Sequence, residues 1–248
     1  MRQLVFKLLS KIEGAAGYAR GRGYGTATIE QEVRLALKAL KRAPRLAVDI
    51  GGSVGSYSAA LRRRCPGVEV HLFEPSSSSL ASLRQRFASD HAVAIVPLAL
   101  SDAAGSSTLF SNKPGSGLAS LSKRNLDHRG IKFDLEETVS TARFEDYWSQ
   151  QLAKRPVDLA KIDVEGHELA VLQGFGSALA ATSVVQFEFG GTNIDTRTFF
   201  RDFWYFFREH SFDIHRITPL GLEHIHRYRE SYECFDISNY IAINRRPG

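Results

Sequence analysis

Apolar and polar residues alternate along this chain in blocks that predict a regular succession of strands and helices. Short apolar runs bounded by turn residues predict strands at 46–50, 68–73, 92–98, 159–164, 184–189, 212–217 and 240–244. Longer stretches with helical periodicity predict helices at 56–64, 77–88, 167–179 and 198–210. This repeated order is typical of an α/β protein with a doubly wound, mostly parallel seven-stranded sheet. We expect the last two strands to form an antiparallel C-terminal edge.

Two segments fall outside this regular alternation. Residues 1–44 are predicted to form an N-terminal helical extension, with an amphipathic helix, a connector at 15–28 and a second helix at 29–40. Lys7 and Lys11 interrupt the apolar residues of the first helix, whose apolar face suits its own domain, a second subunit of a homodimer or an anionic membrane surface. The main domain is predicted to span 45–248 and to carry a hairpin or lid insertion near 105–140.

The composition narrows the possible partners. With 248 residues, of which 43% are hydrophobic, the chain can bury one full core. Cys65 and Cys234 lie far apart without a CxxC or Cys/His cluster, so the sequence predicts neither a disulfide framework nor a zinc site and fits a reducing cytoplasm. The net charge of +5 weakly favours anionic partners, but acidic residues are interspersed, and charge alone does not indicate nucleic-acid binding.

The segment 48–55 joins the first predicted strand to the first helix, at the edge of the sheet where such folds bind ligands. Gly51 and Gly55 permit a sharp turn and a close approach to a ligand. Asp49 is expected to order the loop or hold a cationic amine, and Ser53 adds a hydrogen-bonding group. A dinucleotide site requires three glycines in GxGxxG spacing, and the third glycine of this loop is not at the required position. The loop therefore favours S-adenosylmethionine as the cofactor.

The ends of the next two strands supply the remaining candidate cofactor residues. Glu74 follows the second strand, where its carboxylate can accept hydrogen bonds from both ribose hydroxyls. Leu100 follows the third strand and is expected to form an apolar wall for adenine. Asp102 is expected to meet the exocyclic amine of adenine, although Ser101 or Asp102 can equally cap a helix.

Four segments together resemble the FkbM family of methyltransferases. They are residues 48–55, 73–75, 99–102 and 159–168, the last reading Leu-Ala-Lys-Ile-Asp-Val-Glu-Gly-His-Glu. The resemblance implies a class I (Rossmann-like) methyltransferase fold, S-adenosylmethionine as donor, and O-methylation of sugar or polyketide hydroxyls. Ser53 departs from the family pattern, which usually has Asn there, and this puts the local contact of that residue in doubt. The resemblance covers roughly residues 45–244.

The acidic segment after the fourth main strand is the candidate catalytic centre. Asp163 and Glu165 end this strand, and His167 and Glu168 begin the next helix. A hydroxyl acceptor must lose its proton during transfer, so a base is needed near the methyl group. Asp163 is the preferred base and is also expected to contact the cofactor. His167 is the alternative, because imidazole titrates near neutral pH, although a helix N-terminus disfavours its charged form.

Glu188, at the end of the fifth main strand, is a further catalytic candidate. We expect it to orient the acceptor or to hydrogen-bond Lys161. Alternatively, Asp163, Glu188 and Asn193 would bind a divalent cation such as magnesium, which lowers the pKa of an acceptor hydroxyl. The sequence favours the first interpretation, and no residue is assigned as a metal ligand.

Other segments leave the acceptor open. A small molecule or glycan is expected, and Trp204, Tyr205 and the polar stretch 224–229 are candidates for contacting it. The three consecutive arginines at 62–64 suggest nucleic acid as an alternative substrate. However, the Asn-Pro-Pro-Tyr motif typical of enzymes that methylate bases does not follow the fourth strand. A protein that binds the cofactor without catalysis is the remaining alternative.

Overall fold

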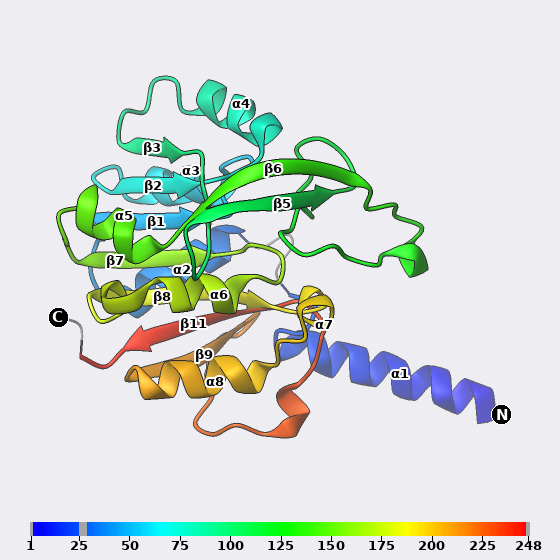
Figure 1. Ribbon diagram of the computed structural model, residues 1–248. Coiled ribbons are helices and arrows are strands. Elements are labelled where there is room, and N and C mark those ends of the chain that lie inside the picture. Colours follow the sequence, from blue (N-terminus) through cyan, green and yellow to red (C-terminus); the bar gives the residue numbers. More distant parts are fainter. Residues whose placement is uncertain (1, 25–28, 247–248) are drawn as a thin grey trace.

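The strands predicted from the apolar runs pair into one sheet in the computed structural model, which describes residues 2–24 and 29–246 (Figure 1). In the described chain, the sheet has the order β10-β9-β11-β8-β7-β1-β2-β3. The strands are β1 (Leu46–Ile50), β2 (Glu69–Phe73), β3 (Val93–Val96), β7 (Val157–Ile162), β8 (Thr182–Phe189), β9 (Phe212–Thr218), β10 (Gly221–His224) and β11 (Ser238–Asn244). The five neighbouring strands β3, β2, β1, β7 and β8 are parallel, whereas β11 is antiparallel to β8 and β9. The predicted α/β class with an antiparallel edge is therefore confirmed.

One strand of this sheet was not predicted. β10 extends the sheet to eight strands among the described residues, because the chain turns back after β9 and pairs Gly221 with Thr218. The strand spans only four residues and none of them is fully buried. Such a short and partly polar segment lacks the apolar alternation by which a strand is recognised in a sequence.

Helices cover both faces of the sheet (Figure 1). They are α2 (Ile29–Leu40), α3 (Ser56–Arg64), α4 (Ser77–Arg86), α5 (Phe144–Gln150), α6 (Glu168–Gly174), α7 (Thr192–Thr196) and α8 (Phe200–Glu209), with short 3-10 helices at Asp127–Arg129, Gly176–Leu179 and Glu230–Tyr232. One core cluster joins the sheet to α5, α6 and α8, and the other joins it to α2, α3 and α4. All six residues of β7 are buried, as expected for a strand covered on both sides.

The two N-terminal helices differ in how they meet the rest of the protein. In α2, Val33 and Ala36 are fully buried against the sheet and α3. In α1 (Arg2–Ala19), no residue is buried, and the helix projects from the body of the protein (Figure 1). No helix within 2–24 or 29–246 is both long and apolar enough to cross a membrane. Contact of α1 with a second subunit or with a membrane surface stays a prediction.

A second, smaller sheet follows β3. It consists of β4 (Ala99–Leu100), β5 (Gly105–Ser111) and β6 (Leu135–Ala142), in the order β4-β6-β5. β5 and β6 pair antiparallel over their full lengths, from Gly105 with Thr141 to Ser111 with Leu135. We call the connecting segment, residues 112–134, the lid loop. It lies at the carboxyl edge of the main sheet, where its residues line the pocket described next.

Candidate active site

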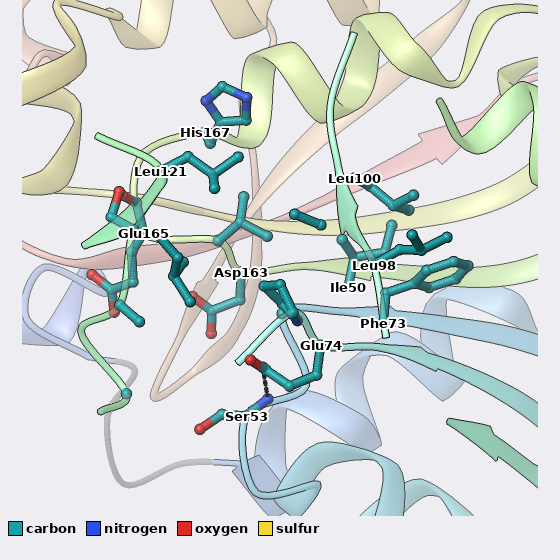
Figure 2. A pocket seen from close by; sticks show the side chains of 18 of the residues that line it. Ile50, Ser53, Phe73, Glu74, Leu98, Leu100, Leu121, Asp163, Glu165 and His167 are labelled. Atoms are coloured by element: carbon teal, nitrogen blue, oxygen red, sulfur yellow. Dashed lines mark hydrogen bonds between the residues drawn. The ribbon is translucent and has the colours of Figure 1, made fainter. Parts of the chain in front are cut away.

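A pocket of about 560 Å³ lies at the carboxyl ends of β1, β2 and β7, under the lid loop (Figure 2). We call it the small pocket. Its lining consists of Ile50, Gly51, Ser53, Phe73, Glu74, Pro75, Leu98, Ala99, Leu100, Leu109, Ser116, Gly117, Ala119, Ser120, Leu121, Asp163, Val164, Glu165 and His167. Parallel pairing explains the arrangement, because Ile50 lies beside both Phe73 and Ile162, so the following residues emerge at one edge.

The glycines of the β1 loop are required by the protein's own packing. Gly51 has φ +79°, and a Cβ atom there would lie 1.9 Å from the carbonyl oxygen of Asp163. Gly55 has φ +77°, and its Cβ atom would lie 2.5 Å from the ring of Phe87. Both positions adopt the left-handed conformation that favours glycine. These glycines therefore allow close approaches to Asp163, just after β7, and to Phe87, just after α4. Gly55 does not line the small pocket.

Glu74 is the buried carboxylate of the small pocket, with 6% of its surface exposed. The backbone N–H of Ser53 donates to its Oε2 atom at 2.8 Å, and the N–H of Ser76 donates to Oε1 at 2.9 Å. Burial raises the pKa of Glu74 to about 7, although these two hydrogen bonds act in the opposite direction. Each carboxylate oxygen keeps a lone pair for a further donor.

Ser53 contacts Glu74 through its backbone, so the contact does not depend on the length of its side chain. The residue has φ +48°, in the left-handed region. Asn adopts this region more readily than most residues other than glycine, which explains in physical terms why Asn suits this position in the resembled family. The substitution by Ser therefore leaves the hydrogen bond to the carboxylate in place.

Asp163 and Glu165 lie in a tightly held loop after β7. Lys161 Nζ donates to Asp163 Oδ2 at 2.9 Å, and the Lys161 side chain is 10% exposed, whereas that of Asp163 is 33% exposed. Glu168 holds the loop by accepting hydrogen bonds from the N–H groups of Val164 and Gly166, each at 3.1 Å. Asp163 thus presents a carboxylate to the pocket while a buried ammonium group fixes its direction.

The lid loop is attached to this segment by a buried arginine that the sequence analysis did not single out. Arg124 Nη1 lies 2.9 Å from Glu165 Oε2, and Arg124 Nε lies 3.3 Å from Asp195 Oδ2. The hydroxyl of Ser120 also donates to the carbonyl oxygen of Glu165 at 2.8 Å. Burial, reinforced by Asp163, raises the pKa of Glu165 to about 8 despite the arginine. No local sequence pattern marks Arg124, because its partners lie 41 and 71 residues away.

His167 lines the small pocket at the opposite side from Ser53 (Figure 2). Its Nε2 atom lies 2.9 Å from the Ser101 hydroxyl, which in turn donates to Asp102 Oδ1 at 2.9 Å. Burial lowers the pKa of His167, while the Asp102 carboxylate acts in the opposite direction. Asp102 therefore contacts the hydroxyl that holds His167, and it does not line the pocket.

A second cavity of about 2130 Å³ adjoins the small pocket on the side of α2 and α3. We call it the large cavity, and its walls include Glu32, Asp49, Tyr57, Lys161, Glu188 and Asn239. Six residues line both spaces, namely Gly51, Ser53, Ser116, Gly117, Asp163 and Glu165. Asp49 accepts a hydrogen bond from the Ser58 hydroxyl at 2.6 Å. Its other oxygen, Oδ1, is buried and accepts no hydrogen bond from the described residues.

The structure brings most of the predicted site residues together but separates them into groups. Gly51, Ser53, Glu74, Leu100, Asp163 and His167 line the small pocket, and Asp49 and Glu188 line the large cavity. Gly55 and Asp102 line neither space. Trp204, Tyr205 and the segment 224–229 also line neither, because α8 covers the other face of the sheet, where Phe203 and Phe207 stack on Phe187.

The alternative metal site does not form in the described structure. Asn193 Oδ1 already accepts the N–H of Gly190 at 2.8 Å, and its Nδ2 atom donates to Thr198. Asn193 lines neither space with Asp163 and Glu188. Within the described ranges, no three or more His, Cys, Asp or Glu side chains are grouped so that they could hold a metal ion.

The fold and the site together are those of a class I methyltransferase, and comparison with known proteins gives the family. Residues 49–214 match the methyltransferase FkbM domain, so the chain belongs to the FkbM family, whose methyl donor is S-adenosylmethionine. The lining of the small pocket suits this donor. Leu98 and Leu100 offer apolar walls for the adenine base, and the buried carboxylate of Glu74 has free lone pairs for the hydroxyls of the ribose.

Three relatives illustrate the range of similarity. Methyltransferase 1 of Beauveria bassiana is 27% identical over 142 residues, which are 51% of this chain and 57% of that protein. The 2-O-methyltransferase NoeI of Sinorhizobium fredii is 26% identical over 159 residues, which are 60% of this chain and 65% of that protein. The crystal structure of methyltransferase FkbM from Methylobacillus flagellatus has a TM-score of 0.46 at 15% identity and covers 80% of this chain and 43% of that one. The chain thus spans less than two thirds of these relatives.

Proposed function

We propose that this protein is an S-adenosylmethionine-dependent O-methyltransferase that acts on a hydroxyl group of a small molecule or glycan. The observation that carries this proposal is the position of Asp163, which lines both the small pocket and the large cavity. With the donor in the small pocket and the acceptor in the large cavity, Asp163 stands where the two substrates meet. The name of the relative NoeI, a 2-O-methyltransferase, supports the choice of oxygen as the methylated atom.

The residues of the small pocket are assigned to the donor as follows. Glu74 accepts hydrogen bonds from the ribose hydroxyls, because its oxygens remain available beside the N–H groups of Ser53 and Ser76. Leu98 and Leu100 form the apolar walls for adenine. Asp49 lies outside the small pocket, in the wall of the large cavity beside the shared residues Gly51 and Ser53, and is assigned to the ammonium group of the methionine part where the two spaces join. Bound S-adenosylmethionine supplies an electrophilic methyl group on a positively charged sulfur.

The protein's part in the transfer is alignment, exclusion of water and removal of one proton. The acceptor oxygen must lie in line with the breaking bond between sulfur and methyl, so that the new oxygen–methyl bond forms from the opposite side. The Asp163 carboxylate takes the hydroxyl proton, and the hydrogen bond from Lys161 keeps this carboxylate directed. The lid loop covers the site through Arg124 and Ser120.

The nucleic-acid alternative finds little support in the position of the arginine triplet. Arg62 is paired with Asp90, and Arg63 and Arg64 are paired with Glu30. The triplet ends α3, which begins at the β1 loop and runs away from the site. These arginines are therefore engaged with the protein itself and line neither the small pocket nor the large cavity.

The proposal is tested by supplying the purified protein with methyl-labelled S-adenosylmethionine and with fractions of glycans, small metabolites, lipids and nucleic acids. Label is expected in an alkali-stable methyl ether of the glycan or small-molecule fraction. The same reaction with Asp163→Asn is the control for transfer by this site. Label in RNA or DNA would overturn the acceptor assignment, and label on nitrogen or carbon would overturn O-methylation.

A further inference from the structure

The wall of the large cavity carries two hydrogen-bonding side chains that the protein leaves unused. Glu188 on β8 and Asn239 on β11 are directly opposite each other in the antiparallel ladder, and both line the cavity. Directly opposed side chains share one face of a sheet, with Cβ atoms about 5 Å apart. Neither makes a hydrogen bond or ion pair with any residue in the described ranges.

This lack of partners is unusual for side chains in their position. Asn239 is only 5% exposed, and its amide is absent from the fully buried unpaired groups of the described residues, so it opens onto the cavity without a protein partner. Gln186, two residues before Glu188 on the same face, shows the ordinary arrangement. It accepts from the Tyr57 hydroxyl at 2.9 Å and donates to Glu32 at 2.7 Å. On this face of the sheet, the unpaired hydrogen-bonding side chains Glu188 and Asn239 therefore lie where the sheet borders the large cavity.

We propose that Glu188 and Asn239 form the recognition site for two neighbouring hydroxyl groups of the acceptor, which is then a vicinal diol such as a sugar ring presents. This inference rests on the proposed function and specifies the substrate class for it. The two side chains stand side by side on one wall, and each hydroxyl of a diol both donates and accepts a hydrogen bond, as the Asn239 amide does.

The electrostatics of the wall agree with an uncharged, hydroxyl-rich ligand. Burial, reinforced by Asp163, Glu165 and Glu168, raises the pKa of Glu188 well above its ordinary value. A protonated carboxyl group both donates and accepts hydrogen bonds, as the neighbouring amide does. Asp163 lines the same cavity, so a diol held by this pair shares the space into which the base opens.

The test measures binding of methyl hexopyranosides that differ in the configuration of their adjacent hydroxyls, together with their monodeoxy analogues, by ligand-observed NMR with and without S-adenosylhomocysteine. We expect at least one glycoside with adjacent hydroxyls to bind, and its deoxy analogue to bind about tenfold more weakly. Asn239→Leu, which keeps the volume and removes the amide, should weaken the diol about tenfold and abolish the difference from the deoxy analogue. Glu188→Gln should retain binding, and Asn125→Leu is the matched change at an exposed position outside both spaces.

The outcomes separate this inference from the proposed function. If the wild type binds S-adenosylhomocysteine and transfers methyl groups, but none of the glycosides binds or Asn239→Leu binds them unchanged, the diol site is rejected alone. If the wild type binds no S-adenosylhomocysteine in calorimetry, the methyltransferase proposal fails, while glycoside binding still decides the role of Glu188 and Asn239. Unchanged thermal unfolding of Asn239→Leu shows that loss of binding is local.

Discussion

The small pocket and the large cavity share a wall but are built in different ways. The small pocket draws its polar residues from the carboxyl ends of the parallel strands β1, β2 and β7, and each of these residues is held by neighbours. The large cavity draws on α2, α3, the lid loop and the antiparallel strand β11, and some of its side chains have no partner among the described residues. The site assigned to the cofactor is therefore held in place by the protein's own hydrogen bonds. The site assigned to the acceptor presents side chains whose hydrogen-bonding groups have no partner in the described protein.

The largest expected effect comes from the residue that belongs to both spaces. Asp163→Asn should lower kcat by about 10²- to 10⁴-fold, because the amide cannot take the acceptor proton. The affinity for S-adenosylhomocysteine should change by less than about threefold, since the amide preserves the shape of the side chain. Initial rates with labelled donor and titration calorimetry measure the two quantities.

Asp134→Asn provides the matched control, because Asp134 is exposed and lines neither space. It should leave both quantities unchanged. A turnover of Asp163→Asn equal to the wild type would remove the base assignment and with it the claim that the two spaces work together at this residue.

The second effect concerns only the small pocket. Glu74→Ala should weaken binding of S-adenosylhomocysteine by roughly 10- to 100-fold, because two charge-assisted hydrogen bonds to the ribose are lost. The glycoside affinity of the large cavity should stay within about twofold. Calorimetry of both ligands on one preparation makes the comparison, and equal weakening of both would show that the spaces are not independent.

The pH dependence of donor binding sharpens this assignment. The pKa of Glu74 is raised to about 7, so the protonated form predominates below that pH without ligand. Hydroxyl donors prefer the ionised carboxylate, so affinity should rise by about tenfold per unit from pH 5.5 to 7 and level off above 7. The same raised pKa means that the carboxyl group lowers stability as pH rises from about 4.5 to 7. Glu74→Gln should remove the pH dependence, and a slope that persists in this variant would assign it to another group.

A smaller effect is expected from the lid loop, which lines both spaces. Arg124→Met keeps the apolar stem of the side chain but leaves Glu165 and Asp195 without their buried cation. We expect about a tenfold rise in KM for donor and acceptor together, and faster proteolytic cleavage within 112–134. Lys123→Met removes an exposed neighbouring charge and should do neither. A rise in one KM alone would show that the lid serves one space only.

The contrast between the two spaces also explains what the sequence could predict. Glu74 and Asp163 were found because parallel strands with known connections bring their carboxyl ends to one edge. Asn239 could not be found by this rule, since β11 runs the other way and reaches the cavity at its beginning. Leu121 and Arg124 reach the site through the lid loop and Leu109 reaches it from β5, and no periodicity in the sequence indicates the path of these segments. The segment 198–210 was correctly predicted as a helix, but Trp204 is buried in the core and Tyr205 is exposed to solvent, so neither lines the site.

The smallest expected effect tests whether the small pocket contains a catalytic base of its own. His167 lines that pocket but not the large cavity, and Ser101 holds its Nε2 atom. Burial lowers the pKa of His167, so the imidazole is neutral at pH 7 and could accept a proton if an acceptor reached it. Because the acceptor is placed beyond Asp163, His167→Ala should lower kcat by less than about threefold, with Ser101→Ala giving a similar change. A loss of 10²-fold or more, with a pH profile that shifts in Ser101→Ala, would move the acceptor into the small pocket and make His167 the base.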